Sequence, residues 1–383
     1  MLERLQQFLA KIQAVEGTPE TLAAADGKVR VDVGVQFEAK VPPIKREIAT
    51  SNFSPLGLLV GEKGGGIALV TEINTPDTMT GLPEHEPLLR SCGMTVTATR
   101  RIPVGAIASG PMLRNATITG GTSGATGRLL IDATNGDSHL YFAPLSGSFA
   151  AEVITASGGG TATSSAVSAV YGARANPVTP SEIITCEFQN DGFAYSLRDC
   201  MSNVSFDVEA SHQGKFKFSP MGVKGTWGTK AMTTGIAFDV GNPPLLQNSS
   251  LKIGSFLPVF SKIGFDMGAK LIYRKDGNAV GNTGLRGARI VDRDPRLKIT
   301  VEHELAATFD FFGAYDAQTT YALKFQIGTL VGKRFFHFSP AAQIANPPTL
   351  SSLEGIRGIE LEFLLTSTAQ VQGADGEFEW LWL

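Results

Sequence analysis

Several residue patterns that mark well-known protein classes are missing from this sequence of 383 residues. It has only three cysteines, too few and too dispersed for a disulfide framework or a zinc knuckle. They are predicted to be free thiols, with a bond between Cys186 and Cys200 as the alternative. The five histidines form no H-x-H or H-E-x-x-H spacing, so no dedicated metal site is expected.

An excess of charge of one sign is also lacking. The chain has 33 basic and 36 acidic residues, which gives a formal net charge of −3. A general nucleic-acid binder would carry a basic excess or a basic stripe, so that class is not expected. No apolar run reaches the ~18 residues of a membrane span, and charges interrupt the N-terminal stretch where a signal peptide would be apolar. We therefore expect synthesis in the cytoplasm without export.

Recognisable catalytic motifs are absent as well. The glycine-rich stretches 61–66 and 120–128 lack the features of a phosphate-binding loop and are predicted to be turns. There is no G-x-S-x-G motif, and no cysteine has a histidine close to it in the sequence. Asp292 and Asp294 alternate with arginines beside a proline, which indicates a solvated turn or a salt-bridge cluster between subunits. The sequence therefore predicts a protein that is not an enzyme and needs no cofactor.

What the sequence does contain is a strong β-strand signal. Apolar and polar residues alternate with a period of two, or form short apolar runs, in many segments. These segments are 29–35, 67–73, 183–188, 193–197, 204–208, 216–218, 271–273, 297–301, 321–327, 335–338, 359–363 and 378–382. Glycine is abundant too, with 43 residues, as many turns require. An all-β, mainly antiparallel fold is predicted.

A few segments depart from this strand pattern. Apolar residues at spacings of three and four predict a short amphipathic helix over 1–13, and a second short helix is expected over 84–92. Runs of glycine, serine and threonine within 103–180 predict loops in an inserted β-unit. The turn at 373–376 is expected to close a final hairpin.

Short echoes within the sequence indicate an internal duplication. ITCE at 184–187 is echoed by ITVE at 299–302, and GKFKFSP at 214–220 by GKRFFHFSP at 332–340. Each FSP is followed, in the same order, by Asn-Pro-Pro. The predicted organisation is an N-terminal helix and arm over 1–27, a first β-domain over 28–245 with its insertion at about 103–180, and a second β-domain over 246–383.

Three stretches of the chain are similar to segments of one protein family. They are LAKIQAVEGTPETLAAADGKVRV at 9–31, FQNDGFAYSLRDCMSNVSFDVEASHQGKFKFSPMGV at 188–223 and IVDRDPRLKITVEHE at 290–304. They resemble the opening, the hairpin stretch and the late "i.dR.p" segment of the major tail tube proteins of long, non-contractile-tailed bacteriophages. The chain departs from that family at Arg198, Asp199 and Cys200, where the family often has a Gly-Ala-like pair.

The resemblance implies a β-sandwich or open-barrel domain that joins its strands across subunits, and the internal duplication implies two such domains in tandem. Rings of such subunits stack into a tube around a tape-measure protein in the tail of the virion, after synthesis in the host bacterial cytoplasm. Two domains per chain favour homotrimeric, pseudo-hexameric rings, with a hexamer as the alternative. The implied further partners are the tail terminator, the distal tail proteins and viral DNA in transit, which is not bound specifically.

Two sets of residues are candidates for assembly surfaces. Contacts between rings or subunits are expected at Leu5, Phe8, Leu9, Asp292, Arg293 and Asp294. Residues 353–383 carry six carboxylates against Arg357 alone, a sum of 1 − 6 = −5. Since a basic wall would hold DNA by counterion release, an acidic lumen or exposed face is expected there. Its candidate residues are Glu354, Glu360, Glu362, Glu377 and Glu379.

The sequence is also compatible with other functions. Another ring-forming β-rich tail component, such as a tail terminator or a baseplate ring, would share these sequence features. A carbohydrate-binding β-protein is the less favoured alternative, because it would show clustered exposed aromatics and paired carboxylates. Two of the three tryptophans, Trp380 and Trp382, lie in the terminal strand and are expected to be structural.

Overall fold

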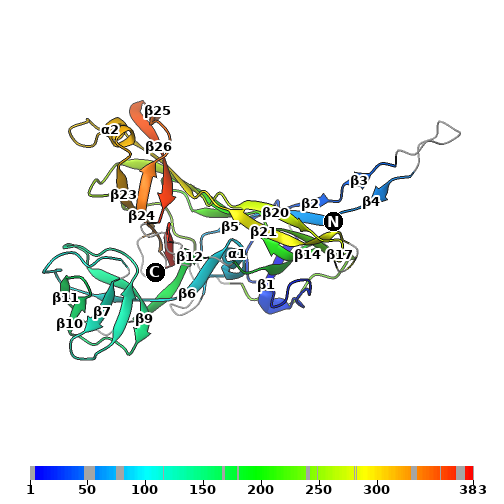
Figure 1. The fold of residues 1–383 in the computed structure, drawn as a ribbon, viewed down its shortest axis with the longest axis horizontal. Helices are drawn as coiled ribbons and strands as arrows, with labels where there is room; N and C mark the ends of the chain where they lie inside the picture. Colours follow the sequence, from blue (N-terminus) through cyan, green and yellow to red (C-terminus); the bar gives the residue numbers. More distant parts are fainter. Residues whose placement is uncertain are drawn as a thin grey trace.

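The chain folds into an elongated β-protein, shown as a computed structural model in Figure 1. The structure describes residues 5–46, 57–74, 82–114, 116–165, 169–178, 181–238, 242–247, 249–279, 281, 283–328, 334–353, 355–367 and 376–382. Every strand pairing within these ranges is antiparallel. The predicted all-β, mainly antiparallel class is confirmed.

One sheet, called sheet 1, forms the half of the molecule that carries the N-terminus. In spatial order its strands are β1 (Gln6–Ile12), β13 (Ile184–Asn190), β14 (Phe193–Met201), β17 (Met221–Thr229), β5 (Gly64–Glu72) and β2 (Gln36–Lys40). The predicted β13–β14 hairpin is confirmed. It turns at Asp191 and Gly192, whose φ angles of 37° and 89° suit a tight primed turn.

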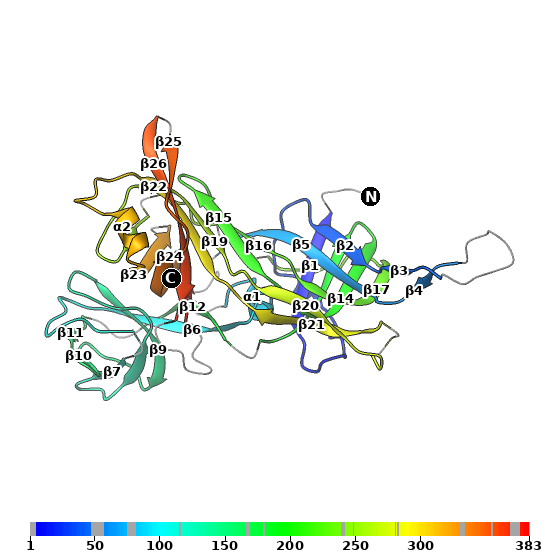
Figure 2. The same ribbon diagram turned by 45° about the horizontal axis from the view of Figure 1, so that its top comes forward.

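An arm continues from sheet 1 and points away from the body (Figures 1 and 2). It contains β3 (Pro43–Ile44) and β4 (Leu59–Val60), which pair with each other. The side chains of Ile44, Leu59 and Val60 are exposed on it. The arm therefore carries apolar surface that its own chain leaves uncovered.

A longer sheet, called sheet 2, runs along the molecule and joins its two halves. Its strands follow in the order β5, β16 (Lys215–Phe218), β15 (Val204–Glu209), β19 (Phe260–Asp266), β22 (Arg296–Glu302), β26 (Ile356–Thr366), β24 (Phe335–Ile344), β23 (Thr320–Ile327) and β18 (Leu251–Ile253). A further strand, β25 (Thr349–Leu353), pairs with β26 in a projecting hairpin. Because β15 pairs with β19, sheet 2 crosses residue 245 without interruption.

A chain of further strands connects sheet 2 to a separate small β-unit. β24 pairs with β27 (Glu379–Trp382), which pairs with β12 (Ala169–Pro177), and β12 pairs with β6 (Met94–Pro103). The inserted unit itself consists of β7 (Thr117–Gly120), β8 (Thr126–Leu129), β9 (His139–Ser146), β10 (Val153–Ala156) and β11 (Thr161–Thr163). It has its own buried core, which includes Ile118, Leu140 and Phe142.

The main core lies on the inward face of sheet 2 and is rich in aromatic rings. Phe216 stacks on Trp380 with 5.2 Å between ring centroids, and Phe206 stacks on Phe265 at 5.4 Å. Trp380 and Trp382 are fully buried, as the sequence predicts for structural tryptophans. Such rings bury large apolar areas, so this cluster holds the terminal strand β27 against the two halves of the chain.

Two short helices and one ribbon complete the described fold. Helix α1 (Glu86–Ser91) falls within the predicted 84–92 segment, whereas α2 (Phe311–Asp316) has no counterpart among the predictions. Asp310 precedes α2, and its carboxylate accepts a hydrogen bond from the Gly313 amide at 2.9 Å. The ribbon, formed by β20 (Lys270–Lys275) and β21 (Leu285–Asp292), lies against β14 and β17.

The helix predicted over residues 1–13 is wrong, because this segment contains strand β1. Neighbouring residues of a strand point to opposite faces, yet Phe8, Leu9 and Ala10 are all buried. Both faces of β1 are therefore covered, so apolar and polar residues do not alternate along it. The remaining apolar spacings of three and four residues resemble those of a helix. Pairing with β13 in register, from Gln6 with Asn190 to Ile12 with Ile184, fixes the strand.

Three smaller predictions also need correction. Residues 29–35 form no regular strand: Val33 is 59% exposed, and Gly34 has a φ of 109° that interrupts an extended chain.

The turn predicted at 61–66 is only partly right, because its last three glycines begin β5. There a Cβ on Gly64 would lie 2.8 Å from the ring of Tyr273. The final hairpin is wrong too, since β27 pairs with β24 and β12 and not with β26; residues 373–375 lie outside the described ranges.

The N-terminal strand predicts a clear mutational contrast. Phe8→Ala should lower the free energy of unfolding by about 3–5 kcal/mol, because it opens a cavity at a fully buried ring. Leu5→Ala, at a side chain that is 43% exposed, should change it by less than about 1 kcal/mol. Urea unfolding of both variants measures this. Equal effects would contradict the placement of β1 in the core.

Candidate functional site

The most extensive functional candidate is the exposed face of five neighbouring strands of sheet 2, β16, β15, β19, β22 and β26, called the charged face. Along each strand alternate residues point to opposite sides. Inward residues such as Phe206, Ile263 and Ile299 are buried in the core. The outward charged residues are Lys215, Lys217, Asp207, Glu209, Lys262, Asp266, Arg296, Lys298, Glu302, Glu360 and Glu362. Five of these are basic and six acidic, so the face sums to −1.

Ion pairs between adjacent strands organise this surface. Lys217 Nζ lies 2.7 Å from an Asp207 carboxylate oxygen, and Lys262 Nζ lies 3.0 Å from Glu209 Oε1. Arg296 Nη1 lies 3.1 Å from Glu362 Oε1. Exposed pairs of this kind contribute little stability one by one. Their effect here is to keep positive and negative charges interleaved across neighbouring strands of the sheet.

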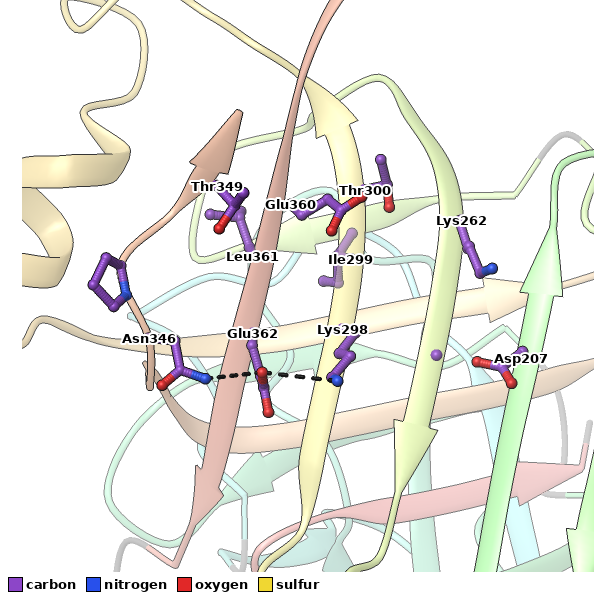
Figure 3. Close-up of a pocket in the computed structure, with 12 residues that line it drawn as sticks. Asp207, Lys262, Lys298, Ile299, Thr300, Asn346, Thr349, Glu360, Leu361 and Glu362 are labelled. Atoms are coloured by element: carbon purple, nitrogen blue, oxygen red, sulfur yellow. Dashed lines mark hydrogen bonds and ion pairs between the residues drawn. The ribbon is translucent and has the colours of Figure 1, made fainter. Parts of the chain in front are cut away.

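A shallow hollow with a volume of about 410 Å³ lies in the middle of the charged face (Figure 3). Its floor is Gly264, which stands in register between Asp207 on β15 and Lys298 on β22. A Cβ at Gly264 would lie 2.7 Å from Asp207 Oδ1, so the bare backbone leaves this space open. On the far side Glu362 lies between Lys298 and Asn346, whose amide donates to it at 2.9 Å.

Hydrogen bonds favour the ionised forms of two groups on this surface, Glu362 and Lys262. Burial raises the pKa of Glu362, but hydrogen bonds from Arg296 and Asn346 outweigh it, so the pKa lies below its usual value. The hydrogen bond from Lys262 to Glu209 raises the pKa of that lysine. These two side chains are therefore charged at neutral pH, and neither is set up for proton transfer.

The residues predicted as subunit contacts are dispersed. Leu5 is 43% exposed, but Phe8 and Leu9 are fully buried in their own chain, so their assignment as contacts is corrected. Asp292 is exposed at the end of β21. Arg293 bonds to Glu377 at 2.9 Å, and Asp294 bonds to Arg296 at 2.9 Å.

The residues predicted as an acidic surface divide into two groups. Glu360 and Glu362 lie on the charged face, whereas Glu379 is fully buried and pairs with Arg114 at 2.6 Å. Glu377 is half-buried and pairs with Arg293 at 2.9 Å. Only Glu379 is fully buried, so the prediction of an exposed acidic face is corrected for Glu379. Glu354 lies outside the described residues.

Sequence reasoning missed the basic half of the charged face and its acidic partners on β15. The alternation of Lys215 and Lys217 with phenylalanines was visible, as was that of Asp207 and Glu209 with apolar residues. What was not visible is that β15 pairs with β19, which brings Lys262 beside Glu209. The surface is consequently mixed in charge, where an acidic one was predicted.

Other kinds of site find no candidates in the described ranges. Within them, no group of three or more His, Cys, Asp and Glu side chains is arranged to hold a metal ion. None of the helices found in the described part of the chain is long and apolar enough to cross a lipid bilayer. The three cysteines are free and buried, and the sulfurs of Cys186 and Cys200 lie 3.6 Å apart. Compared with known proteins, the sequence matches no family model and no curated protein.

The charged face predicts a pH-dependent contribution from Glu362. Its pKa is lowered in the folded chain, so its stabilising effect is present above the usual value of 4.5 and is lost as the pH falls through the folded value. Glu362→Gln should lower stability by about 0.5–1 kcal/mol at neutral pH and by nothing in strong acid. Glu360→Gln, on the same strand and face, is the control. Chemical denaturation at several pH values measures both, and a pH-independent loss for Glu362→Gln would contradict the ion-pair geometry.

The buried pair of Arg114 and Glu379 predicts a larger effect. Arg114→Met leaves the carboxylate of Glu379 fully buried without this cation, which should cost about 3–5 kcal/mol of unfolding free energy. Adding Glu379→Leu should recover much of that loss, because the buried charge then disappears as well. A double variant less stable than Arg114→Met would contradict this account.

Proposed function

We propose that this chain is a structural subunit of a phage tail tube, which assembles into stacked rings that conduct DNA around a tape-measure protein. The observation that carries the proposal is the charged face: a sheet shared by both halves of the chain, buried on one side and open and charge-interleaved on the other. Such a sheet can form the wall of a conduit once copies lie side by side.

The charge balance of this face suits a passage for DNA. A basic wall would bind the phosphate backbone tightly through counterion release. Five basic and six acidic residues, interleaved by ion pairs, give no such excess on the charged face. A polyanion would meet alternating charges there and would find no continuous basic track.

Opposite charges on two segments of the subunit support association of copies head to tail. The β20–β21 ribbon, residues 270–292, carries five basic and two acidic residues, a sum of +3. The segment 302–319 around α2 carries four acidic residues and no basic ones, a sum of −4. Helix α2 lies near one end of the long axis, and the ribbon lies in the half of the molecule that carries sheet 1 (Figures 1 and 2). Contacts of this heterologous kind generate rings when the rotation closes.

The ribbon also has more guanidinium groups than the neighbouring carboxylate of Glu16 can neutralise. Glu16 accepts ion pairs from Arg274 and Arg289, both at 2.7 Å, and from Arg286 at 3.1 Å. One carboxylate neutralises one of three positive charges, so the ribbon can attract further carboxylates. The exposed side chains of Leu305, beside α2, and Val291, on the ribbon, add apolar surface to the two segments.

The finer features of the proposal follow from tandem domains. Two tube-type domains per chain favour a trimeric ring with pseudo-sixfold symmetry, and a ring of six chains is the alternative. The inserted unit would lie outside the conduit. The proposal also includes the tail terminator and the distal tail proteins as partners and the virion tail as the location. It assigns no catalytic activity to the chain. A terminator or baseplate ring is the competing function, since either would form rings that do not stack indefinitely.

Negative-stain electron microscopy of the purified chain, with mass photometry beside it, tests the proposed function. We expect stacked rings or tubes and a ring mass of three chains. Closed rings that never stack would favour the terminator or baseplate alternative. A monomer at every concentration would contradict self-assembly of the chain alone.

A charge-reversal pair sharpens this experiment. Arg274→Glu combined with Arg289→Glu should abolish assembly. Because both arginines also pair with Glu16 in their own chain, circular dichroism must show that this variant is folded. Combining them with Glu304→Lys and Asp316→Lys in the same chain should restore assembly, because the opposed charges are exchanged. Lys217→Glu, outside both segments, serves as the control for adding an acidic residue.

A further inference from the structure

A cleft with a volume of about 470 Å³ separates the inserted unit from the β18–β23 edge of sheet 2. Figure 1 shows the inserted unit at the lower left and β23 and β24 above it. Cationic side chains and rings line the cleft together. The basic residues that line it are Lys252, Lys324 and Arg334; the acidic ones are Asp132 and Asp137; the ring side chains are His139, Tyr141 and Phe336.

Two of the lysines in the cleft form an unfavourable arrangement of charge. Lys252 on β18 and Lys324 on β23 are directly opposite each other in the antiparallel register. Like charges in such a position are destabilising. The side chain of Lys324 is only 18% exposed, and the Asp137 carboxylate is 4.0 Å from its Nζ. Burial lowers the pKa of Lys324, Asp137 opposes this shift, and Lys252 adds to it.

The neighbouring groups do not remove this excess of positive charge. Among the described residues, Nε of Arg334 is buried and has no hydrogen-bond partner. Both carboxylates of the cleft are engaged by backbone amides: Asp132 accepts from Arg114 at 2.6 Å and Asp137 from Thr134 at 2.8 Å. The lining sums to 3 − 2 = +1, with the cations gathered on β18, β23 and the start of β24.

The rings that line the cleft are nearly parallel to one another. Tyr141 on β9 stacks on Phe336 on β24, with 6.3 Å between centroids and 24° between planes. His139 stacks on Tyr141 at 6.2 Å and 26°. All three are half-buried, so part of each ring is open to the cleft. A wall of this kind can pack against the apolar face of a ring-shaped ligand.

We propose that this cleft binds a phosphate group carried on a sugar ring, with Lys252, Lys324 and Arg334 holding the phosphate and Tyr141 and Phe336 packing against the sugar. Phosphate oxygens form charge-assisted hydrogen bonds with such cations and would offset the repulsion between the two lysines. A volume of about 470 Å³ lies in the range of ~300–1,000 Å³ typical of small-molecule sites. Since the cleft lies within one chain, the proposal does not depend on assembly.

Isothermal titration of the full chain with glucose 6-phosphate, inorganic phosphate and glucose tests the proposal. We expect glucose 6-phosphate to bind more tightly than inorganic phosphate, and glucose to bind more weakly than glucose 6-phosphate. Lys252→Met should weaken glucose 6-phosphate binding about tenfold or more, because a charged hydrogen-bond donor is lost. Its thermal midpoint without ligand should not fall, because removing one lysine also relieves the repulsion.

Lys217→Met, an exposed lysine on the charged face, is the matched control and should leave the affinity unchanged. If neither phosphate compound binds, or if Lys252→Met binds as the unaltered chain does, the proposal is overturned. Equal affinity for inorganic phosphate and glucose 6-phosphate would overturn the role of the ring wall. Lys324→Met tests the same site at the more buried lysine, and Lys252→Met remains informative if that variant does not fold.

Discussion

The pairing of β15 with β19 is the contact on which the rest of this structure depends. These strands, Val204–Glu209 and Phe260–Asp266, come from the two halves of the chain and exchange hydrogen bonds in register from Ser205 to Glu209. Without this ladder the molecule would have two sheet edges exposed between its halves, and such edges favour aggregation. With it, one sheet extends along the body, and its inward side chains share a single aromatic core.

This continuity constrains both faces of the sheet together. A shift of one residue in any strand would move its apolar residues outward and its charged residues into the core. The cross-strand pairs between Lys262 and Glu209 and between Arg296 and Glu362 form only in the observed register. The open, charge-balanced face and the buried aromatic face are therefore two results of the same register, and the proposed conduit wall rests on both.

Local sequence patterns predicted much of this fold and little of its long-range pairing. The alternation around Phe206 and Phe216 identified β15 and β16, and Asp191-Gly192 identified a hairpin. The apolar spacing of β1 imitates a helix because the strand is covered on both faces, a property set by distant parts of the chain. Glu379 was expected at the surface, yet it is buried because Arg114, 265 residues away in the sequence, lies beside it. Charge in the sequence therefore located the acidic C-terminal segment without revealing which carboxylates face solvent.

The most direct test of this account is a cryo-electron microscopy reconstruction of the assembled particle at a resolution that traces strands. The account predicts that β16, β15, β19, β22 and β26 line the central channel, with Lys298 and Glu362 facing inward. A reconstruction with these strands on the outer surface, or with the charged face buried between subunits, would contradict it.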